Sequence, residues 1–445
     1  MSAQAGFDHL FHTLAPNRAD MENAVPLTNE NCAAATEGRG IPVDIAVAKA
    51  VAIARTVAEI ERIPLMDAAG RVLAGEINAA IELPPFDNSA MDGYAIRTAH
   101  LSGAGPWELS VGGRAAAGEV HAGRGSRPKE AIRIFTGAAM PSGFDAVVMQ
   151  EHCERVGDRI LVARLPRRGE NVRHAGEDVR AWNLLMGAGD QLLPQRLALL
   201  AGQGLDTVEV LRKVRIGLIS TGSELRDPGE PLGRGQIYNS NRVMIRAMMS
   251  GLPWAEIVDY GIIPDRRDAL AEAFGEAPRR CDVLVTTGGV SAGEEDHVVS
   301  ALGCHGGSLV VLKVAMRPGK PVKIGMIGPI LFAGLPGNPN AALVTFRQIA
   351  LPAIRTIAGL RRVGPDWSTA IAGFTYEKRL GRTEFVPVRI TGRDESGRPL
   401  LEMLGRGSSA SLMAMSLADG IAMLPPDVVS IERGLLLSFE SLSSN

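Results

Sequence analysis

Aromatic residues are scarce in this sequence, and no charge of one sign dominates it. Phe, Trp and Tyr make up 4% of the 445 residues, so the chain has few of the stacking platforms that bind single-stranded nucleic acid. The formal net charge is only −2, which gives no general field to attract nucleic acid or an acidic membrane. Any anion site must therefore be local, and we expect no nucleic-acid partner.

Cysteines are also few, and they are far apart. Cys32, Cys153, Cys281 and Cys304 form no CxxC pair and have no zinc-type spacing with histidine. Reduced thiols in a cytoplasmic protein are the simplest interpretation. No apolar run approaches the roughly 20 residues that span a bilayer, and the N-terminus lacks a signal-like pattern, so we expect no membrane partner.

Common catalytic signatures are missing as well. The sequence has no GxSxG, GxGxxG or Walker A motif, so serine hydrolase, dinucleotide-dependent and P-loop functions have no support. Of eight histidines, only His297 falls in a candidate loop, and a lone histidine is more often structural. The chain is nevertheless too long for one core and predicts roughly two to four domains.

Strand and helix patterns alternate through residues 214–362. Buried-strand runs such as 215–220 and 282–286 end in glycine-rich loops, and helical stretches follow them. This alternation predicts a doubly wound domain with a parallel sheet covered on both faces. Ligands bind such sheets at the edge where the strands have their carboxyl ends.

The remaining segments complete a multidomain α/β fold with two β domains. Short β-type runs predict an inserted β domain over residues 81–180 and a C-terminal β domain over residues 363–445. Residues 41–80 and 181–213 carry helical patterns and are interpreted as a discontinuous linker region, with a helix expected over most of the second segment. Residues 1–40 show no sustained period and are interpreted as a tail.

Residues 281–341 concentrate glycines, acids and cations near the predicted ligand edge. Glycines there let backbone N–H groups approach an anion, and Mg²⁺ needs only one or two protein carboxylates. A solvated charged turn would explain any one of these residues better, whereas the whole set indicates a phosphate or oxyanion site with a metal. The charged residues are Glu294, Glu295, Asp296, Lys313, Arg317 and Lys320.

A second unusual stretch covers residues 81–96, where paired prolines precede a cluster of turn-forming polar residues. A tight Asx turn explains Asn88 and Asp92 better than a functional role, whereas Asp87 is less easily explained that way. Thr136 and Asp178 also have ordinary alternatives, as a strand-end hydroxyl and as a helix cap or surface carboxylate.

Six motifs occur in a fixed order along the chain. Together they resemble the molybdopterin molybdenumtransferase family of the MoeA type, which is also represented by the C-terminal domain of gephyrin. The resemblance spans roughly residues 41–440. The motifs are PFDNSAMDGYA at 85–95, STGSE at 220–224, IYNSNR at 237–242, TGGVSAGEED at 287–296, MRPGKP at 316–321 and GLPGNP at 334–339.

The resemblance implies that molybdate and adenylylated molybdopterin are converted to molybdenum cofactor and AMP with the help of Mg²⁺. It implies an elongated homodimer in which the inserted β domain reaches the partner's pterin-binding domain. Molybdopterin adenylyltransferase and molybdoenzyme apoproteins are further implied partners. Arg317 departs from the lysine that many family members carry, and Asn239 departs from a frequent aspartate.

The resemblance also implies two sets of site residues. The catalytic set is Asp87, Thr136, Asp178, Glu224, Asp265, Asp296, Lys313, Arg317 and Lys320, of which Glu224, Asp265 and Asp296 would hold the metal. The set that binds cofactor and substrate is Thr221, Gly222, Ser223, Gly288, Gly289, Val290, Ser291, Gly293, Pro336, Gly337, Asn338, Pro339, Arg382, Ser408 and Ser409. Two alternative functions stay open: a non-catalytic pterin-binding or scaffold protein, and a molybdopterin adenylyltransferase.

Overall fold

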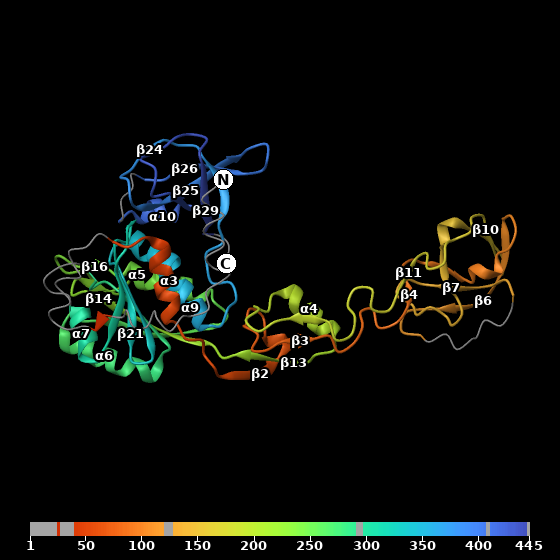
Figure 1. Cartoon of the computed structure of the whole chain (residues 1–445), viewed down its shortest axis with the longest axis horizontal. Helices are drawn as coiled ribbons and strands as arrows, with labels where there is room; N and C mark the ends of the chain where they lie inside the picture. Colours follow the sequence, from red (N-terminus) through yellow and green to blue (C-terminus); the bar gives the residue numbers. More distant parts are fainter. Residues whose placement is uncertain (1–24, 27–39, 120–127, 291–296, 406–409, 443–445) are drawn as a thin grey trace.

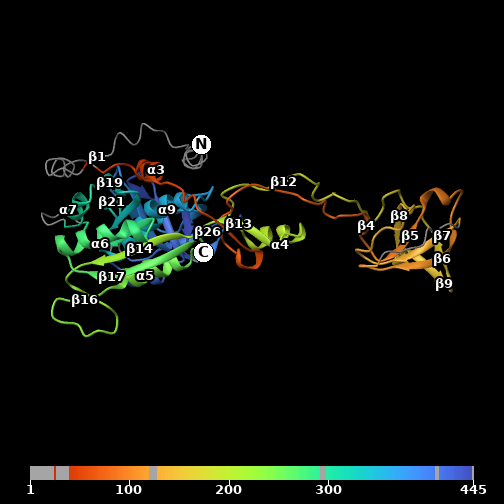
Figure 2. The ribbon, with the colours of Figure 1, turned by 90° about the horizontal axis from the view of Figure 1, so that it is seen from below.

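The chain folds into an elongated molecule with two bulky ends. The computed structural model describes residues 25–26, 40–119, 128–290, 297–405 and 410–442. The inserted β domain forms one end, and the doubly wound domain with the C-terminal β domain forms the other (Figure 1). A narrow linker joins the two ends, and Figure 2 shows that the chain crosses it twice. No described helix is long and apolar enough to cross a membrane.

A seven-stranded sheet is the centre of the doubly wound domain. The strands β22, β18, β14 and β17 are parallel neighbours, as the alternating pattern predicts. In spatial order the sheet contains β1 (Val25–Pro26), β19 (Ser308–Lys313), β21 (Pro321–Ile327), β22 (Ile330–Leu335), β18 (Val283–Thr287), β14 (Val214–Thr221) and β17 (Ala255–Ile263).

The sheet is mixed, and this corrects the expectation of a wholly parallel sheet. The missed strand β21 is antiparallel to both β19 and β22. Only two residues separate β21 from β22, and Gly328 in this hairpin has a φ of +54°. Since β19 is antiparallel to β21, it runs in the same direction as β22 and β18. Lys313, the last residue of β19, therefore lies at the same edge of the sheet as Thr287, the last residue of β18.

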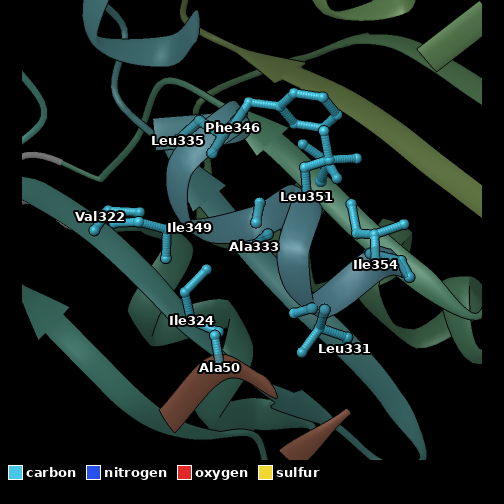
Figure 3. Packing of buried hydrophobic residues seen from close by; sticks show 14 of the residues in the cluster. Ala50, Val322, Ile324, Leu331, Ala333, Leu335, Phe346, Ile349, Leu351 and Ile354 are labelled. Atoms are coloured by element: carbon cyan, nitrogen blue, oxygen red, sulfur yellow. The ribbon is translucent and has the colours of Figure 1, made fainter. Parts of the chain in front are cut away.

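Helices cover both faces of this sheet. Side chains of β18 alternate between the two layers, because Val283 and Val285 pack with one set of helices and Leu284 with the other. Figure 3 shows the first layer, where Ile349 lies near Val322 and Ala333 and Phe346 lies near Leu335. That layer contains α3 (Val43–Ile53), α5 (Ser240–Ser250), α8 (Pro339–Thr345), the π-helical turn η5 (Phe346–Ala350) and α9 (Leu351–Ile357). The other layer contains α6 (Arg267–Arg280) and α7 (His297–Cys304).

Two segments differ from the sequence prediction. The helix α3, expected in the linker region, packs against the doubly wound sheet through small side chains such as Ala46 and Ala50, which are fully buried. Most of residues 181–213 is not helical. The segment contains β12 (Leu184–Met186), α4 (Pro194–Gly202) and β13 (Thr207–Leu211), and β2 (Ile60–Pro64) and β3 (Ile77–Asn78) pair with β13 and β12.

Each predicted β domain contains one six-stranded sheet. The inserted domain has the order β8-β5-β7-β6-β10-β9, with strands β5 (Gly93–Ile96), β6 (Trp107–Ala115), β7 (Glu130–Ile134), β8 (Ala146–Met149), β9 (Cys153–Val156) and β10 (Arg159–Val162). Where this domain meets the linker, β4 (Asn88–Ser89) pairs with β11 (Val172–Arg173). Single 3₁₀ turns η2 (Leu65–Asp67), η3 (Thr98–His100) and η4 (Gln150–His152) connect these elements.

The C-terminal sheet closes into a barrel and captures one strand of the doubly wound domain. Closure follows because β27 pairs with both β29 and β25. The captured strand is β20 (Met316–Arg317), which pairs with β25 in parallel. The barrel elements are β23 (Ser368–Ala372), β25 (Thr383–Arg393), β26 (Pro399–Met403), α10 (Leu412–Ser416), β27 (Gly420–Leu424) and β29 (Leu436–Ser441), with β24 (Tyr376–Glu377) paired to β28 (Ser430–Ile431) beside them.

Arg212 ties the linker to the doubly wound sheet. Directly after β13, its Nη1 and Nη2 donate to Asp282 Oδ2 and Oδ1 at 2.7 and 2.8 Å, and the Arg215 amide donates to the same carboxylate at 2.8 Å. Burial alone would raise the pKa of Asp282, but the hydrogen bonds from Arg212 and Arg215 outweigh it and hold this pKa below its usual value. The linker is therefore attached to the start of β18 by a partly buried ion pair.

Asp282→Asn should lower the free energy of unfolding at neutral pH by about 3 kcal/mol, because the Arg212 guanidinium would keep only the exposed Glu59 carboxylate and lose its partly buried partner. The stabilisation by Asp282 is present above the unfolded pKa of 3.8 and disappears as the pH falls through the lower folded pKa. The thermal unfolding temperatures of the wild type and the Asp282→Asn variant should therefore converge at acid pH. Asp366→Asn is the control, since Asp366 pairs with Arg362 at the surface and contributes under about 1 kcal/mol. Equal losses in the two variants would contradict this account.

Candidate functional site

Three parallel strands end side by side at the predicted ligand edge. Thr221 ends β14, Thr287 ends β18 and Leu335 ends β22. The Ser220 and Thr287 hydroxyl oxygens lie 3.1 Å apart in the buried sheet. The Gly288 amide donates to the Leu335 carbonyl at 3.1 Å, which fixes the start of the β18 loop against the end of β22. The loops after these strands therefore begin together.

The paired glycines after β18 are required by a close approach to β14. Gly288 has a φ of +89°, and a Cβ there would lie 2.3 Å from the Thr221 carbonyl oxygen. Gly289 has a φ of +65°, and a Cβ there would lie 2.6 Å from Val298 Cγ2. Both positions therefore exclude side chains for two independent reasons, conformation and space. Val290, which follows, is buried, whereas the predicted residues Ser291, Gly293 and Asp296 lie outside the described residues.

The turn from β22 to α8 joins the same edge. It contains the predicted residues Pro336, Gly337, Asn338 and Pro339. A Cβ on Gly337 would lie 3.9 Å from Gly288 Cα, so the two glycine loops face each other. Asn241, in the first turn of α5, donates from Nδ2 to the Gly337 carbonyl at 2.7 Å and is largely buried. Asn241 was not among the predicted site residues, although it lies in the IYNSNR motif.

Two of the predicted metal ligands flank the turn after β14. The Thr221 hydroxyl donates to Asp265 Oδ1 at 3.3 Å. Glu224 and Ser223 are exposed on the turn, and a Cβ on Gly222 would lie 2.8 Å from Glu224 Oε2. Within the described ranges, no three His, Cys, Asp or Glu side chains are grouped to hold a metal. Mg²⁺ that bridges protein to phosphate needs only one or two carboxylates, so the donor chemistry of Glu224 and Asp265 suits it.

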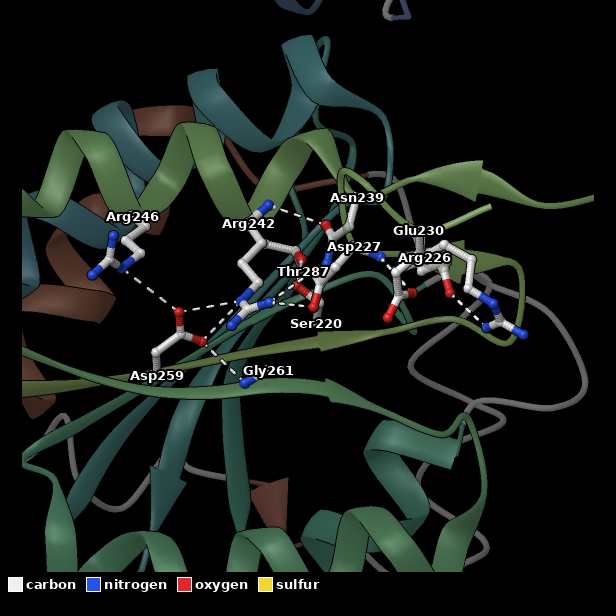
Figure 4. A network of polar contacts seen from close by, with 11 residues as sticks. Ser220, Arg226, Asp227, Glu230, Asn239, Arg242, Arg246, Asp259, Gly261 and Thr287 are labelled. Carbon is white, nitrogen blue, oxygen red and sulfur yellow. Dashed lines mark hydrogen bonds and ion pairs between the residues drawn. The ribbon is translucent and has the colours of Figure 1, made fainter. Parts of the chain in front are cut away.

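An arginine held between two aspartates anchors the segment that follows this turn and leads to α5 (Figure 4). Arg242 Nη1 donates to Asp227 at 2.7 and 2.8 Å, and its Nε donates to Asp259 at 3.0 and 3.2 Å. The hydrogen bonds to Asp259 and Asp227 raise the pKa of Arg242. Asn239 caps α5 by accepting the Arg242 amide at 3.1 Å. Arg242 is thus engaged by carboxylates and attaches both β17 and the end of β15 (Leu225–Arg226) to α5, while β16 (Ile237–Tyr238) pairs with β15.

The predicted cations are distributed along the loop after β19. Lys313 ends that strand, and its carbonyl accepts the Ile41 amide at 3.1 Å. Lys320 is exposed, and its carbonyl accepts the Val314 amide at 3.0 Å. Arg317 is directed towards the C-terminal barrel, where its Nη1 donates to the Tyr376 hydroxyl at 3.0 Å.

Arg317 and Arg382 converge on one buried carboxylate. Arg382 Nε and Nη2 lie 2.8 and 2.7 Å from Glu384 Oε1, and Arg317 Nη1 lies 3.5 Å from Glu384 Oε2. The structure therefore brings together two predicted cations from different domains. Glu384 and Tyr376 were not predicted. The other predicted residues of this group, Ser408 and Ser409, lie outside the described residues.

The predicted residues of the inserted domain gather where that domain meets the linker. Asp87 Oδ1 accepts the Ala175 amide at 2.8 Å, and its Oδ2 lies 3.2 Å from His174 Nδ1. The Ala175 hydrogen bond, together with His174, holds the pKa of Asp87 below its usual value. Asp178 is exposed in the same loop, and its amide donates to the Leu83 carbonyl at 3.1 Å. His174 was not predicted, because it lies in none of the six motifs.

Thr136 lies in the loop after β7, and this loop is joined to the group through the Met140 amide, which donates to the Asp87 carbonyl at 2.9 Å. Its amide and its hydroxyl both donate to Asp92 Oδ1 at 2.8 Å. Asp92 therefore orients Thr136, and Asn88 bonds locally through Nδ2 to the Phe86 carbonyl at 3.2 Å. The Asn88 contact is local, as a structural role predicts, whereas the Asp92 carboxylate bonds a residue far along the chain and forms no tight Asx turn.

The candidate residues of one chain thus form two separate groups. One group lies at the edge formed by β14, β18 and β22 and at the neighbouring barrel. The other lies near β4 and β11, on the far side of the linker (Figures 1 and 2). A single chain does not bring Asp87 to Glu224.

Comparison with known proteins assigns every part of this architecture to one group of relatives. Residues 41–204 match the model of the MoeA N-terminal region (domains I and II), residues 217–356 match a probable molybdopterin-binding domain, and residues 369–442 match the MoeA C-terminal region (domain IV). These three matches cover the linker and inserted domain, the doubly wound domain and the barrel in turn.

Similarity to individual proteins extends over most of the chain. The chain is 39% identical over 327 residues to molybdopterin molybdenumtransferase of Haemophilus influenzae, covering 73% of this chain and 80% of that protein. It is also 39% identical over 388 residues to the protein of that name from Nostoc sp., covering 84% and 87%. A crystal structure of a molybdopterin biosynthesis MoeA protein from Pyrococcus horikoshii OT3 superposes with a TM-score of 0.77 at 28% identity, covering 91% of this chain and 100% of that one.

Gly288→Ala should lower the free energy of unfolding more than Gly204→Ala does. Both glycines have a left-handed φ, +89° and +80°, but the space around Gly204 is open within 4 Å, whereas a Cβ on Gly288 meets the Thr221 carbonyl. The difference between the losses of unfolding free energy in the two variants isolates the cost of the steric clash, which we expect to be about 1–3 kcal/mol. Thermal unfolding of both variants measures it, and indistinguishable losses would show that the loop moves away from β14 freely.

Proposed function

The chain belongs to the MoeA family of molybdopterin molybdenumtransferases, and we propose that it transfers molybdenum from molybdate to adenylylated molybdopterin, forming molybdenum cofactor and releasing AMP. It is a transferase, as its relatives of that name are. The observation that carries the proposal is the meeting of two glycine loops with Thr221 at one sheet edge, next to an arginine pair where the doubly wound domain meets the barrel. Such an edge suits a phosphorylated pterin, and the arginines suit a tetrahedral dianion.

The glycine loops are assigned to the phosphate groups. Gly288, Gly289 and Gly337 bring the backbone close to a ligand, and backbone N–H groups in such loops bind anionic oxygens. Glu224 and Asp265 would hold Mg²⁺, which when bound neutralises charge on the phosphate that is cleaved. Lys313 and Lys320 add positive charge at the end of β19, where the negative charge of the released AMP would develop.

The arginine pair is assigned to molybdate. Guanidinium groups offer several N–H donors in a fixed plane and keep their charge at any physiological pH. Arg317 and Arg382 reach this place from different domains, so the anion would bind where the doubly wound domain meets the barrel. Ser408 and Ser409 belong to this proposal through the family resemblance.

We also propose a homodimer in which the inserted domain completes the partner's site. Asp87, Thr136 and Asp178 lie beyond the linker from their own glycine loops, so they serve that site only if a second copy supplies the other half. Asp87 is ionised at neutral pH, and its lowered pKa makes it a weak proton acceptor and suits it better to hold a cation or a hydrogen-bond donor. We place the protein in the cytoplasm, in line with the free thiols of Cys153, Cys281 and Cys304.

Purified protein incubated with adenylylated molybdopterin, Mg²⁺ and molybdate should release AMP only when molybdate is present. The same mixture should reconstitute a molybdoenzyme that lacks its cofactor. Pterin binding without AMP release would instead support a binding or scaffold protein. Adenylylation of free molybdopterin by ATP would support an adenylyltransferase.

Mixing two inactive variants tests the composite site. Asp87→Ala and Arg382→Ala should each abolish most activity, because each removes one half of every site. When subunits exchange at random, half of the dimers are heterodimers, and each has one site with both halves intact. The mixture should therefore recover up to about a quarter of the wild-type rate of AMP release. No recovery after demonstrated subunit exchange would show that each chain uses its own inserted domain.

A further inference from the structure

Glu384 is the buried centre of the arginine pair. Its side chain is 1% exposed, whereas those of Arg382 and Arg317 are 29% and 40% exposed. Glu384 Oε1 takes both contacts from Arg382, and Oε2 accepts the Tyr376 hydroxyl at 3.1 Å. A buried carboxylate is stabilising only when it is well paired, and here both of its oxygens are engaged.

Tyr376 links Arg317 to this carboxylate. Its hydroxyl oxygen accepts from Arg317 Nη1 at 3.0 Å while its proton is donated to Glu384. Burial and the nearby Glu384 charge raise the pKa of Tyr376, so the phenol keeps this proton at neutral pH. Arg317 is thereby held by a neutral donor and acceptor as well as by the more distant carboxylate.

We propose that Glu384 and Tyr376 are positioning residues for the oxyanion site, which fix the planes of Arg317 and Arg382 before molybdate binds. This inference rests on the proposed function. Glu384 engages two of the five N–H donors of Arg382, and the remaining donors are those a tetrahedral anion would use. Donors that are already oriented lose less conformational entropy on binding.

The geometry points to an anion bound on the solvent-facing side of Arg317 and Arg382, and not in the cavity between the domains. A cavity of about 20 Å³ lies between the domains, lined in part by Arg317, Pro318, Asn340 and Glu384. A space of that size holds about one water molecule, so a four-oxygen anion does not fit there. Asn340 is in the first turn of α8, which begins at the glycine-containing turn after β22, so this interdomain contact also borders the proposed pterin site.

Electrostatics and positioning predict opposite effects for Glu384→Gln. Removing a negative charge next to two guanidinium groups should strengthen the binding of any anion if charge alone matters. If Glu384 acts by positioning, the variant should bind molybdate more weakly, because the amide accepts fewer and weaker hydrogen bonds from Arg382 and Tyr376. The sign of the change in affinity therefore separates the two roles.

A matched control lies in the same interdomain contact. Glu440 is 5% exposed, accepts from Arg347 Nη2 at 2.7 Å and from Gln348 Nε2 at 2.6 Å, and takes no part in the arginine pair. Glu440→Gln therefore disturbs a comparable buried carboxylate between the same two domains. Tyr376→Phe is the third variant, since it removes one hydroxyl and leaves Glu384 charged.

The test measures molybdate affinity of the full-length protein by calorimetry, and KM for molybdate and kcat for AMP release. We expect Glu384→Gln to raise both Kd and KM for molybdate about tenfold, Tyr376→Phe to raise them less, and Glu440→Gln to lower the thermal unfolding temperature without changing Kd or KM.

Unchanged or tighter molybdate binding in Glu384→Gln, or a loss of kcat alone shared by all three variants, would overturn the inference. If Glu384→Gln fails to fold, Tyr376→Phe decides: because no charge changes, weaker molybdate binding supports positioning and unchanged binding overturns it. Absence of molybdate-dependent AMP release by the wild type would instead refute the proposed function, while the binding arm would still test the positioning role.

Discussion

The close contact between the loop after β18 and the end of β14 is the constraint on which the ligand edge depends. Gly288 has no room for a side chain above the Thr221 carbonyl, and its amide is bonded to Leu335 on the opposite side. The loop is therefore fixed to both neighbouring strands at once. Asn241 in α5 then holds the Gly337 turn through a hydrogen bond to its carbonyl. The elements α5, β14, β18 and β22 therefore all contribute to one small surface. A shift of any one of these strands would displace the others.

Local sequence patterns predicted most of this edge. Buried strands that end in glycines and hydroxyl residues have a strong period and clear end signals, which is why Thr221, Gly288 and Gly337 could be placed together. The direction of β21 was not predictable in the same way, because Pro321 and Gly325 weaken its strand pattern and its orientation follows from a two-residue hairpin. The helix α3 was correctly recognised as a helix, but its partner is decided by packing of small residues against a sheet far along the chain.

The unpredicted site residues share a different property. His174, Asn241 and Tyr376 each contact a residue distant in sequence, and Glu384 joins its near neighbour Arg382 to the distant Arg317. Each lacks a local pattern that distinguishes it from an ordinary polar residue. Asp87 could be singled out because its surroundings were unusual, whereas His174 becomes noticeable only once Asp87 Oδ2 is seen 3.2 Å from its ring. The recognisable part of the site is thus the part built from loops, and the part hidden from sequence is the tertiary support around it.

The linker has a mechanical consequence for the inserted domain. The chain runs outward and returns, and its two passes pair as β2 with β13, β3 with β12 and β4 with β11. Two-stranded ribbons are more strongly twisted than wide sheets. The length and twist of these paired passes therefore set how far, and in which direction, Asp87 is carried from the sheet of its own chain.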